Sequence, residues 1–191
     1  MLNILHLPYR KDRLELLLKQ FEEQGISEYK LWDGVLGQSM RDRRINIVSG
    51  HKKIVQDAKD KKLPFVTIAE DDISFYGKGA WNYYIDNIPQ DYDVYFGMIY
   101  SIDKKAIVEN RLMVESCGMT LYTVNERFYD VFLNLPIDKH IDRSLTSMCL
   151  NYKFLLPDCF VCYQNDTQSD NNMGKPDLSI FLKNRRLFHN C

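Results

Sequence analysis

Three consecutive carboxylates, Glu70, Asp71 and Asp72, are the residues of this sequence whose types and spacing most directly suggest chemistry. They follow residues 65–69, an apolar run with the length and composition of a buried strand. Acidic groups after such a strand lie at the carboxyl edge of a sheet, where open α/β folds bind ligands. Neighbouring like charges repel one another unless a cation or solvent relieves them. Two interpretations stay open: oxygen ligands for a hard divalent metal ion that holds a phosphate-bearing substrate, or a solvated acidic turn.

A basic and aromatic loop follows the first expected strand. Residues 3–7 predict a short strand stopped by Pro8, and Tyr9, Arg10 and Arg13 come directly after it. Such a loop at a strand end could hold a nucleotide, and it could equally be a solvated turn.

The elements that must position these residues alternate in type through the first half of the chain. The patterns predict strands at residues 3–7, 29–32, 65–69, 93–100, 118–124 and 154–163, a hairpin at 107–114, and helices at 14–21, 39–60, 81–88, 125–135, 140–152 and 178–191. We expect Asp12 to cap the first helix and Gly25 to follow its last residue. This order predicts one α/β domain over residues 1–191, with a mixed central sheet whose second half is partly antiparallel.

Three further polar residues have both a structural and a functional interpretation. Asp33 follows the second strand and either accepts a hydrogen bond from a base or ribose or forms an Asp-Gly turn. His51 lies on the apolar stripe of the second helix, where a satisfied core histidine is the default. Asp142 opens a helix in the second half, and helix-dipole stabilisation explains an acid there about as well as catalysis does.

Composition excludes several classes of function. The net charge is −1, from Lys+Arg 25 against Asp+Glu 26, so no global basic field is available for nucleic acid. We expect no signal peptide and no membrane span. The cysteines, Cys117, Cys149, Cys159, Cys162 and Cys191, suit a reducing compartment better than a disulfide framework, so we expect a cytoplasmic location. The zinc-like spacing of Cys159 and Cys162 has no second pair to match, which favours core thiols.

Taken in order, these pieces resemble the GT-A fold of nucleotide-sugar glycosyltransferases, a three-layer α/β/α architecture with an Asp-x-Asp motif at a strand end. More narrowly, the chain resembles glycosyltransferase family 25, the lipooligosaccharide and collagen galactosyltransferase group, and small glycosyltransferase domains of large DNA viruses. The matching pieces span roughly residues 3–170: Arg10 and Arg13, Ser49 to His51, Glu70 to Asp72, and Gln164 with Ser169. The chain departs from the family at His6, where Asn is usual, and at Ala69, where Leu is usual; it is also shorter than most members.

The resemblance implies that the two halves of the chain bind different substrates. Residues 1–100 would bind a nucleoside diphosphate sugar, with a UDP-sugar favoured, and residues 101–191 would bind a glycan or glycoprotein acceptor and include the C-terminal tail. Asp72 and Glu70 would ligate Mn²⁺ or Mg²⁺, which suits oxygen ligands. The donor-binding residues would be Leu7, Pro8, Tyr9, Arg13, Asp33, His51, Glu70 and Asp71, although Asp71 could instead point away.

Inverting transfer, as in family 25, needs a general base. Asp142 is the expected base, with Asp138 and Asp170 as alternatives, and the polar loop at 164–172 could close over the donor. Two other functions remain open. A sugar nucleotidyltransferase would need a glycine-rich phosphate loop, which residues 6–13 lack, and a non-catalytic nucleotide-sugar-binding module could share the fold.

Overall fold

The computed structural model describes residues 1–101, 103, 105–165 and 186–191 of the chain. Its strands are β1 (Leu2–His6), β2 (Tyr29–Asp33), β3 (Phe65–Glu70), β4 (Ile73–Phe75), β5 (Val94–Phe96), β6 (Ile107–Val108), β7 (Arg111–Leu112), β8 (Leu121–Asn125), β9 (Phe154–Leu155), β10 (Cys159–Phe160), β11 (Cys162–Gln164) and β12 (Arg186–Leu187). Its α-helices are α1 (Lys11–Gln24), α2 (Met40–Asp60), α3 (Ala80–Asp86), α4 (Tyr129–Leu133) and α5 (Ile141–Thr146), with short 3₁₀ helices at Glu126–Phe128 and Phe188–Asn190.

Eight strands form a mixed central sheet in the order β2-β1-β3-β8-β5-β9-β7-β6. β1 runs parallel to both β2 and β3, whereas β8 lies antiparallel between β3 and β5. Two small ribbons, β11 with β4 and β10 with β12, extend from it. The expected mixed sheet is therefore confirmed.

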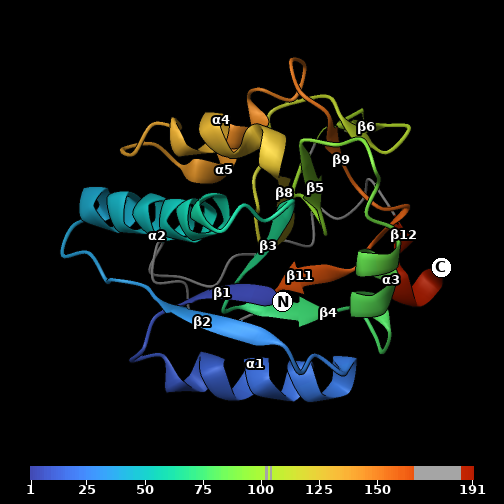
Figure 1. Ribbon diagram of the computed structural model, residues 1–191. Helices are drawn as coiled ribbons and strands as arrows, with labels where there is room; N and C mark the ends of the chain where they lie inside the picture. The colour runs from blue at the N-terminus through green and yellow to red at the C-terminus, as the bar shows by residue number, and fades with distance from the viewer. Residues whose placement is uncertain (102, 104, 166–185) are drawn as a thin grey trace.

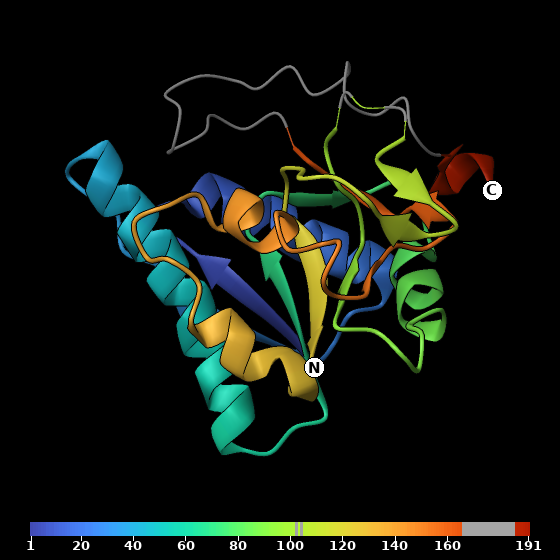
Figure 2. The same cartoon turned by 90° about the horizontal axis from the view of Figure 1, so that it is seen from above.

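Helices cover both faces of the sheet, which makes three layers (Figure 1). α1 lies on one face, where it contacts β4 and α3. α2 lies on the other and packs against α4 and α5, as the view from above also shows (Figure 2). Gly50 lets α2 approach β1 closely, because a β-carbon there would come within 2.6 Å of the Leu5 side chain. α2 and the carboxyl end of β1 are thereby held side by side.

Local signals explain the ends of the two long helices. Ser39 caps α2 and forms a reciprocal capping box with Asp42. Gly25 adopts the left-handed conformation after α1, as expected. The expected cap at Asp12 is wrong: Arg10 occupies the N-cap position, and Asp12 lies in the first turn, where it accepts hydrogen bonds from the Arg10 guanidinium.

The longest strand expected in the second half is interrupted. Residues 154–163 form three short strands, β9, β10 and β11, because Pro157 has no N–H to donate to a ladder. The run at 93–100 is cut to Val94–Phe96, since Gly97 donates to Leu121 O and accepts from Val161 N, which redirects the backbone.

The helix expected at 140–152 is also shorter, ending at Thr146. The Thr146 hydroxyl bonds to the carbonyl groups of Ser116 and Asp142, and a hydroxyl that occupies the Asp142 carbonyl competes with the helical backbone hydrogen bonds there. Most of the helix expected at 178–191 lies outside the described residues, and its described end is β12 followed by a 3₁₀ turn.

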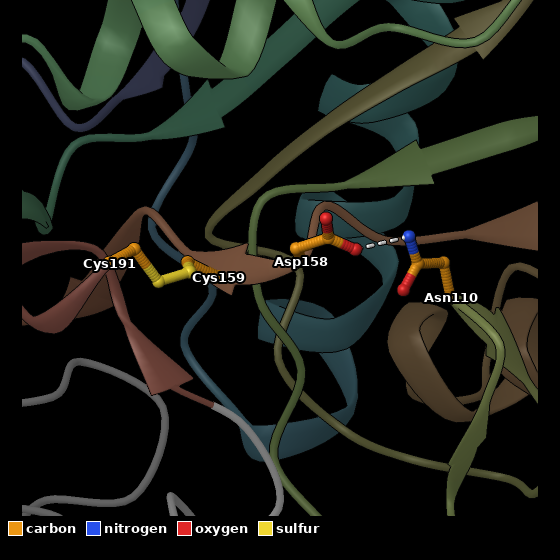
Figure 3. Close-up of a disulfide and its surroundings, with 4 residues drawn as sticks. All are labelled: Asn110, Asp158, Cys159 and Cys191. Carbon is orange, nitrogen blue, oxygen red and sulfur yellow. Dashed lines mark hydrogen bonds between the residues drawn. A yellow bond between two sulfur atoms is a disulfide. The ribbon is translucent and has the colours of Figure 1, made fainter.

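One disulfide, Cys159–Cys191, joins β10 to the last residue of the chain (Figure 3). The expectation of a core thiol is therefore wrong for Cys159, because the strand order brings residues 32 apart in sequence to a Cα separation of 6.6 Å. The same figure shows Asn110, in the β6–β7 turn, donating a hydrogen bond to Asp158. Cys117, Cys149 and Cys162 are free thiols. The cytoplasmic location stays a prediction.

Within the described part of the chain, no helix combines the length and apolar character that crossing a membrane requires.

Candidate functional site

The acidic cluster lies where the parallel strands β1 and β3 end together. Leu5 of β1 pairs in register with Glu70 of β3, and His6 pairs with Asp33 of β2. Asp71 and Asp72 occupy the tight turn between β3 and β4. The parallel register therefore brings the loop after β1 directly to the acidic turn, as the sequence interpretation requires.

Asp71 is used within the protein. Its Oδ2 accepts from Leu7 N at 3.1 Å and lies 2.9 Å from His6 Nδ1, and its Oδ1 accepts from Arg13 Nη1 at 2.7 Å. Burial alone would raise the pKa of Asp71, but the bonds from His6 and Arg13 hold that pKa below its ordinary value. Asp71 thus ties the β1–α1 loop to the end of β3, and its role toward a ligand stays a prediction.

Asp72 is buried but incompletely paired. Its Oδ2 accepts from Gln164 Nε2 at 2.9 Å and lies 3.4 Å from Arg13 Nη1, while Asn165 N donates to its backbone carbonyl. Its Oδ1 is buried and has no hydrogen-bond partner among the described residues. Burial, together with the nearby charge of Glu70, raises the pKa of Asp72 to about 7. A cation beside Oδ1 would relieve this energetic cost.

Glu70 is the most accessible carboxylate of the cluster. Its side chain is 29% exposed, against 5% for those of Asp71 and Asp72. Its backbone N–H donates to Thr120 O, and its Oε1 lies 3.5 Å from Nε2 of the buried His51. Glu70 can therefore offer oxygen ligands to an incoming group.

These residues line one pocket between the carboxyl ends of β1–β3 and the first half of α2. Its walls are Leu5, His6, Leu7, Arg13, residues 34–37, Arg43, Asn46, Ile47, Glu70, Asp71, Asp72 and Gln164. The exposed apolar side chains of Val35 and Leu36 stand in the β2–α2 loop. The pocket thus combines three acidic side chains, two arginines and an apolar rim.

The expected donor-binding residues do not all reach this pocket. Leu7, Arg13, Glu70 and Asp71 line it, as does the metal candidate Asp72. Pro8, Tyr9 and Asp33 flank it without lining it, and the side chain of Tyr9 is exposed. His51 lies fully buried behind Glu70. The roles of these residues stay predictions.

The expected base lies apart from the pocket lining. Asp142 Oδ2 accepts from Gly118 N at 3.2 Å and its Oδ1 from Arg143 N at 2.7 Å. The alternative Asp138 lines a separate depression bordered by α2, α4 and α5, and the alternative Asp170 lies outside the described residues. Gly118 is two residues from Thr120, whose carbonyl binds Glu70 N, so this loop joins Asp142 to the end of β3.

Sequence reasoning missed several lining residues. These are His6, residues 34–37, Arg43, Asn46 and Ile47. His6 carried a usable signal, since it is polar and ends the strand beside Leu7. Arg43 and Asn46 were detectable only as polar positions near the start of a helix that follows a strand end.

The acidic side chains of the site do not by themselves form a complete metal-binding group among the described residues. Over residues 1–101, 103, 105–165 and 186–191, no group of three or more His, Cys, Asp or Glu side chains is arranged to hold a metal ion. A metal bound here would need ligands from a substrate or water in addition to Asp72 and Glu70.

Comparison of the fold with solved structures finds proteins of the same architecture. Protein A197 from STIV matches with a TM-score of 0.51 at 14% identity, over 97% of this chain and 94% of that one. The mannosyltransferase PcManGT from Pyrobaculum calidifontis, solved with GDP-Man and Mn²⁺, matches with a TM-score of 0.54 at 11% identity over 87% of this chain. The fold is GT-A-like. This chain spans 56% of the length of PcManGT.

Sequence comparison adds no family: no protein-family model matches the chain, and no curated protein matches it. The expected GT-A architecture is thus confirmed at the level of the fold, and membership of glycosyltransferase family 25 stays a prediction.

Proposed function

We propose that this protein is a metal-dependent glycosyltransferase that moves a sugar from a nucleoside diphosphate sugar to a glycan or glycoprotein hydroxyl, with inversion. The observation that carries the proposal is Asp72 Oδ1, a buried carboxylate oxygen without a hydrogen-bond partner among the described residues, at the base of a pocket in a GT-A-like fold. Buried carboxylates are normally paired or bound to a cation. A divalent ion beside Asp72 and Glu70 supplies that cation.

The donor atoms present fit Mn²⁺ or Mg²⁺. Asp72 and Glu70 offer only oxygen, and such ions commonly take one or two carboxylates together with phosphate oxygens and water. When bound, the metal stabilises the negative charge that develops on the departing nucleoside diphosphate. PcManGT was solved with both Mn²⁺ and a nucleotide sugar, which supports the same pairing here.

The residues around the metal candidates have positioning roles in this proposal. Gln164 and Arg13 fix Oδ2 of Asp72, which leaves Oδ1 for the ion. Asp71 holds Leu7 N and Arg13, so the β1–α1 loop keeps its shape when the ligand enters. Arg43 and the loop at 34–37 line the side of the pocket where the base and ribose of a UDP-sugar would lie.

Calorimetry tests the proposal directly. Nucleoside diphosphates (UDP, GDP and others) are titrated into the protein with MnCl₂ and, separately, with a chelator. We expect at least one nucleotide to bind tenfold or more tightly with the metal, because Asp72 and Glu70 would hold the ion and the ion would supply positive charge for the diphosphate. Equal affinity under both conditions, for every nucleotide, contradicts the proposal.

Asp142 is our proposed general base, since a helix start held by Gly118 fixes its position. Asp142→Asn keeps size and polarity but cannot accept the acceptor's proton. We expect about a 100-fold lower turnover with unchanged donor affinity, in the range typical of general base catalysis. Steady-state kinetics with a sugar donor that binds measures this, and Asp138→Asn is the matched comparison. Normal turnover in Asp142→Asn with a dead Asp138→Asn would transfer the role to Asp138.

A non-catalytic nucleotide-sugar-binding module is the second candidate. Arg13 already lies 3.4 Å from Asp72, so part of the charge at the site is compensated without a metal. Such a module would bind nucleotide without cleaving the donor. Detection of free nucleoside diphosphate released from a bound sugar nucleotide, with acceptor present, distinguishes the enzyme from the module.

A further inference from the structure

A buried pair of side chains lies directly behind Glu70, on the side away from solvent. His51 comes from α2 and Tyr122 from β8, and both side chains are fully buried. His51 Nδ1 lies 2.7 Å from the Tyr122 hydroxyl. His51 Nε2 has no hydrogen-bond partner among the described residues, and it lies 3.5 Å from Glu70 Oε1. Three elements therefore contribute to one line of polar groups that ends at the pocket.

The hydrogen-bonding chemistry of Tyr122 and His51 indicates which atom of each side chain carries a proton. Burial, with the nearby charge of Glu70, raises the pKa of Tyr122 well above its ordinary value, so the phenol is neutral and keeps one proton to donate. Its nearest acceptor is His51 Nδ1. A neutral imidazole that accepts at Nδ1 carries its own proton on Nε2, which faces the carboxylate. The opposite tautomer would point a nitrogen lone pair at Glu70 across 3.5 Å, which is unfavourable.

Glu70 differs from its neighbours in what holds its side chain. Asp71 and Asp72 are fixed by short hydrogen bonds, at 2.7 Å from Arg13 and 2.9 Å from Gln164. Glu70 is longer and more exposed, and His51 is the buried group that faces it. A ligand carboxylate needs such support, because freezing a flexible side chain costs conformational entropy.

We propose that His51 is a positioning residue for Glu70: Tyr122 fixes the Nε2–H tautomer of His51, and that N–H faces Glu70 Oε1 at 3.5 Å and attracts the carboxylate toward the position where it would meet the cation of the donor complex. The identity of the ligand rests on the proposed function, whereas the tautomer and the contact with Glu70 do not. In this proposal His51 is neither a purely structural core residue nor a direct ligand: it orients a ligand residue.

Nitrogen NMR of the histidine ring tests the arrangement without any ligand. We expect the wild-type protein to show His51 protonated at Nε2 and accepting a hydrogen bond at Nδ1. In Tyr122→Phe the change in Nδ1 chemical shift that this hydrogen bond causes should disappear. Glu70→Gln should move the Nε2 resonance, and Glu115→Gln, at an acid that faces Arg143 and does not line the pocket, should not. A wild-type ring protonated at Nδ1, or an Nε2 resonance unmoved by Glu70→Gln, overturns the proposal.

Binding of UDP in the presence of MnCl₂ tests the consequence. His51→Leu keeps the site apolar and filled, and we expect about tenfold weaker binding, as for other groups that orient metal ligands. His51→Gln places a donor near the Nε2 position and should restore affinity to within about threefold. Tyr84→Phe, which removes an equally buried hydroxyl bonded to Tyr95 O and Thr123, should bind as the wild type does.

The outcomes separate the two proposals. Unchanged binding in His51→Leu, with thermal unfolding confirming a folded variant, overturns the positioning role. Failure of the wild-type protein to bind any nucleotide with metal overturns the proposed function instead, and the NMR response to Glu70→Gln then decides the positioning role alone.

Discussion

Replacing Arg13 with methionine should lower the free energy of unfolding by about 3–5 kcal/mol at neutral pH, the range for breaking a buried ion pair. The Arg13 side chain is only 7% exposed, and its Nη1 lies 2.7 Å from Asp71 and 3.4 Å from Asp72. Methionine keeps much of the apolar stem but leaves both buried carboxylates without that cation. Urea unfolding followed by tryptophan fluorescence measures the loss.

The pH dependence of that loss identifies its cause. Without Arg13, the pKa values of the two aspartates in the folded state should rise, so protonation relieves the repulsion as the pH falls. The deficit of Arg13→Met should therefore shrink between pH 8 and pH 5. Arg127→Met is the matched control, since Arg127 also contacts two aspartates, Asp91 and Asp93, but at the surface, where ion pairs contribute little. A deficit equal at both pH values, or equal in the control, contradicts the assignment.

The first half of the fold follows closely from local sequence signals. β1, α1, β2, α2 and β3 lie within a few residues of their expected positions, because apolar periodicity and the caps at Gly25 and Ser39 act over short distances. The parallel order of strands and helices then brings the end of β1 beside the end of β3. The meeting of the first loop with the acidic turn could thus be predicted from sequence.

The second half could not be predicted to the same degree. Its strands are two to five residues long, and their bounds depend on partners far along the chain. Phe96 pairs with Tyr122, and Leu155 pairs with both Tyr95 and Arg111. No local period reports such pairings, and the disulfide between Cys159 and Cys191 depends on them as well.

The division of roles within the acidic cluster was also beyond sequence reasoning. Glu70, Asp71 and Asp72 are all carboxylates, so the sequence does not distinguish their roles. The turn between β3 and β4 directs Asp71 toward His6 and Arg13. Asp72 is then fixed by Gln164, 92 residues later. Ser169, and the acids at 166 and 170, lie outside the described residues, so the expected loop closure stays a prediction.

The site combines a stabilising carboxylate with a destabilising one. Asp71 has a lowered pKa and satisfied oxygens, so its charge favours the folded state. Asp72 has a raised pKa and an oxygen with no partner among the described residues, so its charge opposes folding. Binding sites often keep such unfavourable groups, because the ligand relieves them. The two aspartates should therefore respond to neutralisation with opposite signs.

Asp72→Asn should accordingly stabilise the protein without metal while removing its response to metal. The folded pKa of Asp72 is about 7, against an ordinary value of 3.8, so between these pH values the folded state binds a proton that the unfolded state has lost. The wild-type free energy of unfolding must then fall, through this group, as the pH rises from about 4 to about 7. Asparagine does not titrate, so the variant should be more stable by roughly 2–4 kcal/mol at pH 8 and nearly equal to the wild type at pH 4.

Unfolding at the two pH values, with and without MnCl₂ and UDP, completes the experiment. The metal and nucleotide should raise the melting temperature of the wild type at pH 8, because a ligand that binds only the folded state stabilises it, and should leave Asp72→Asn unchanged. Asp91→Asn removes an exposed carboxylate paired with Arg127 and should not stabilise at either pH, since the pKa of Asp91 is lowered by its hydrogen bonds to Lys153 and Arg127. If Asp72→Asn were less stable than the wild type at pH 8 without metal, the charge of Asp72 would already be satisfied within the protein, and the case for a bound cation would be lost.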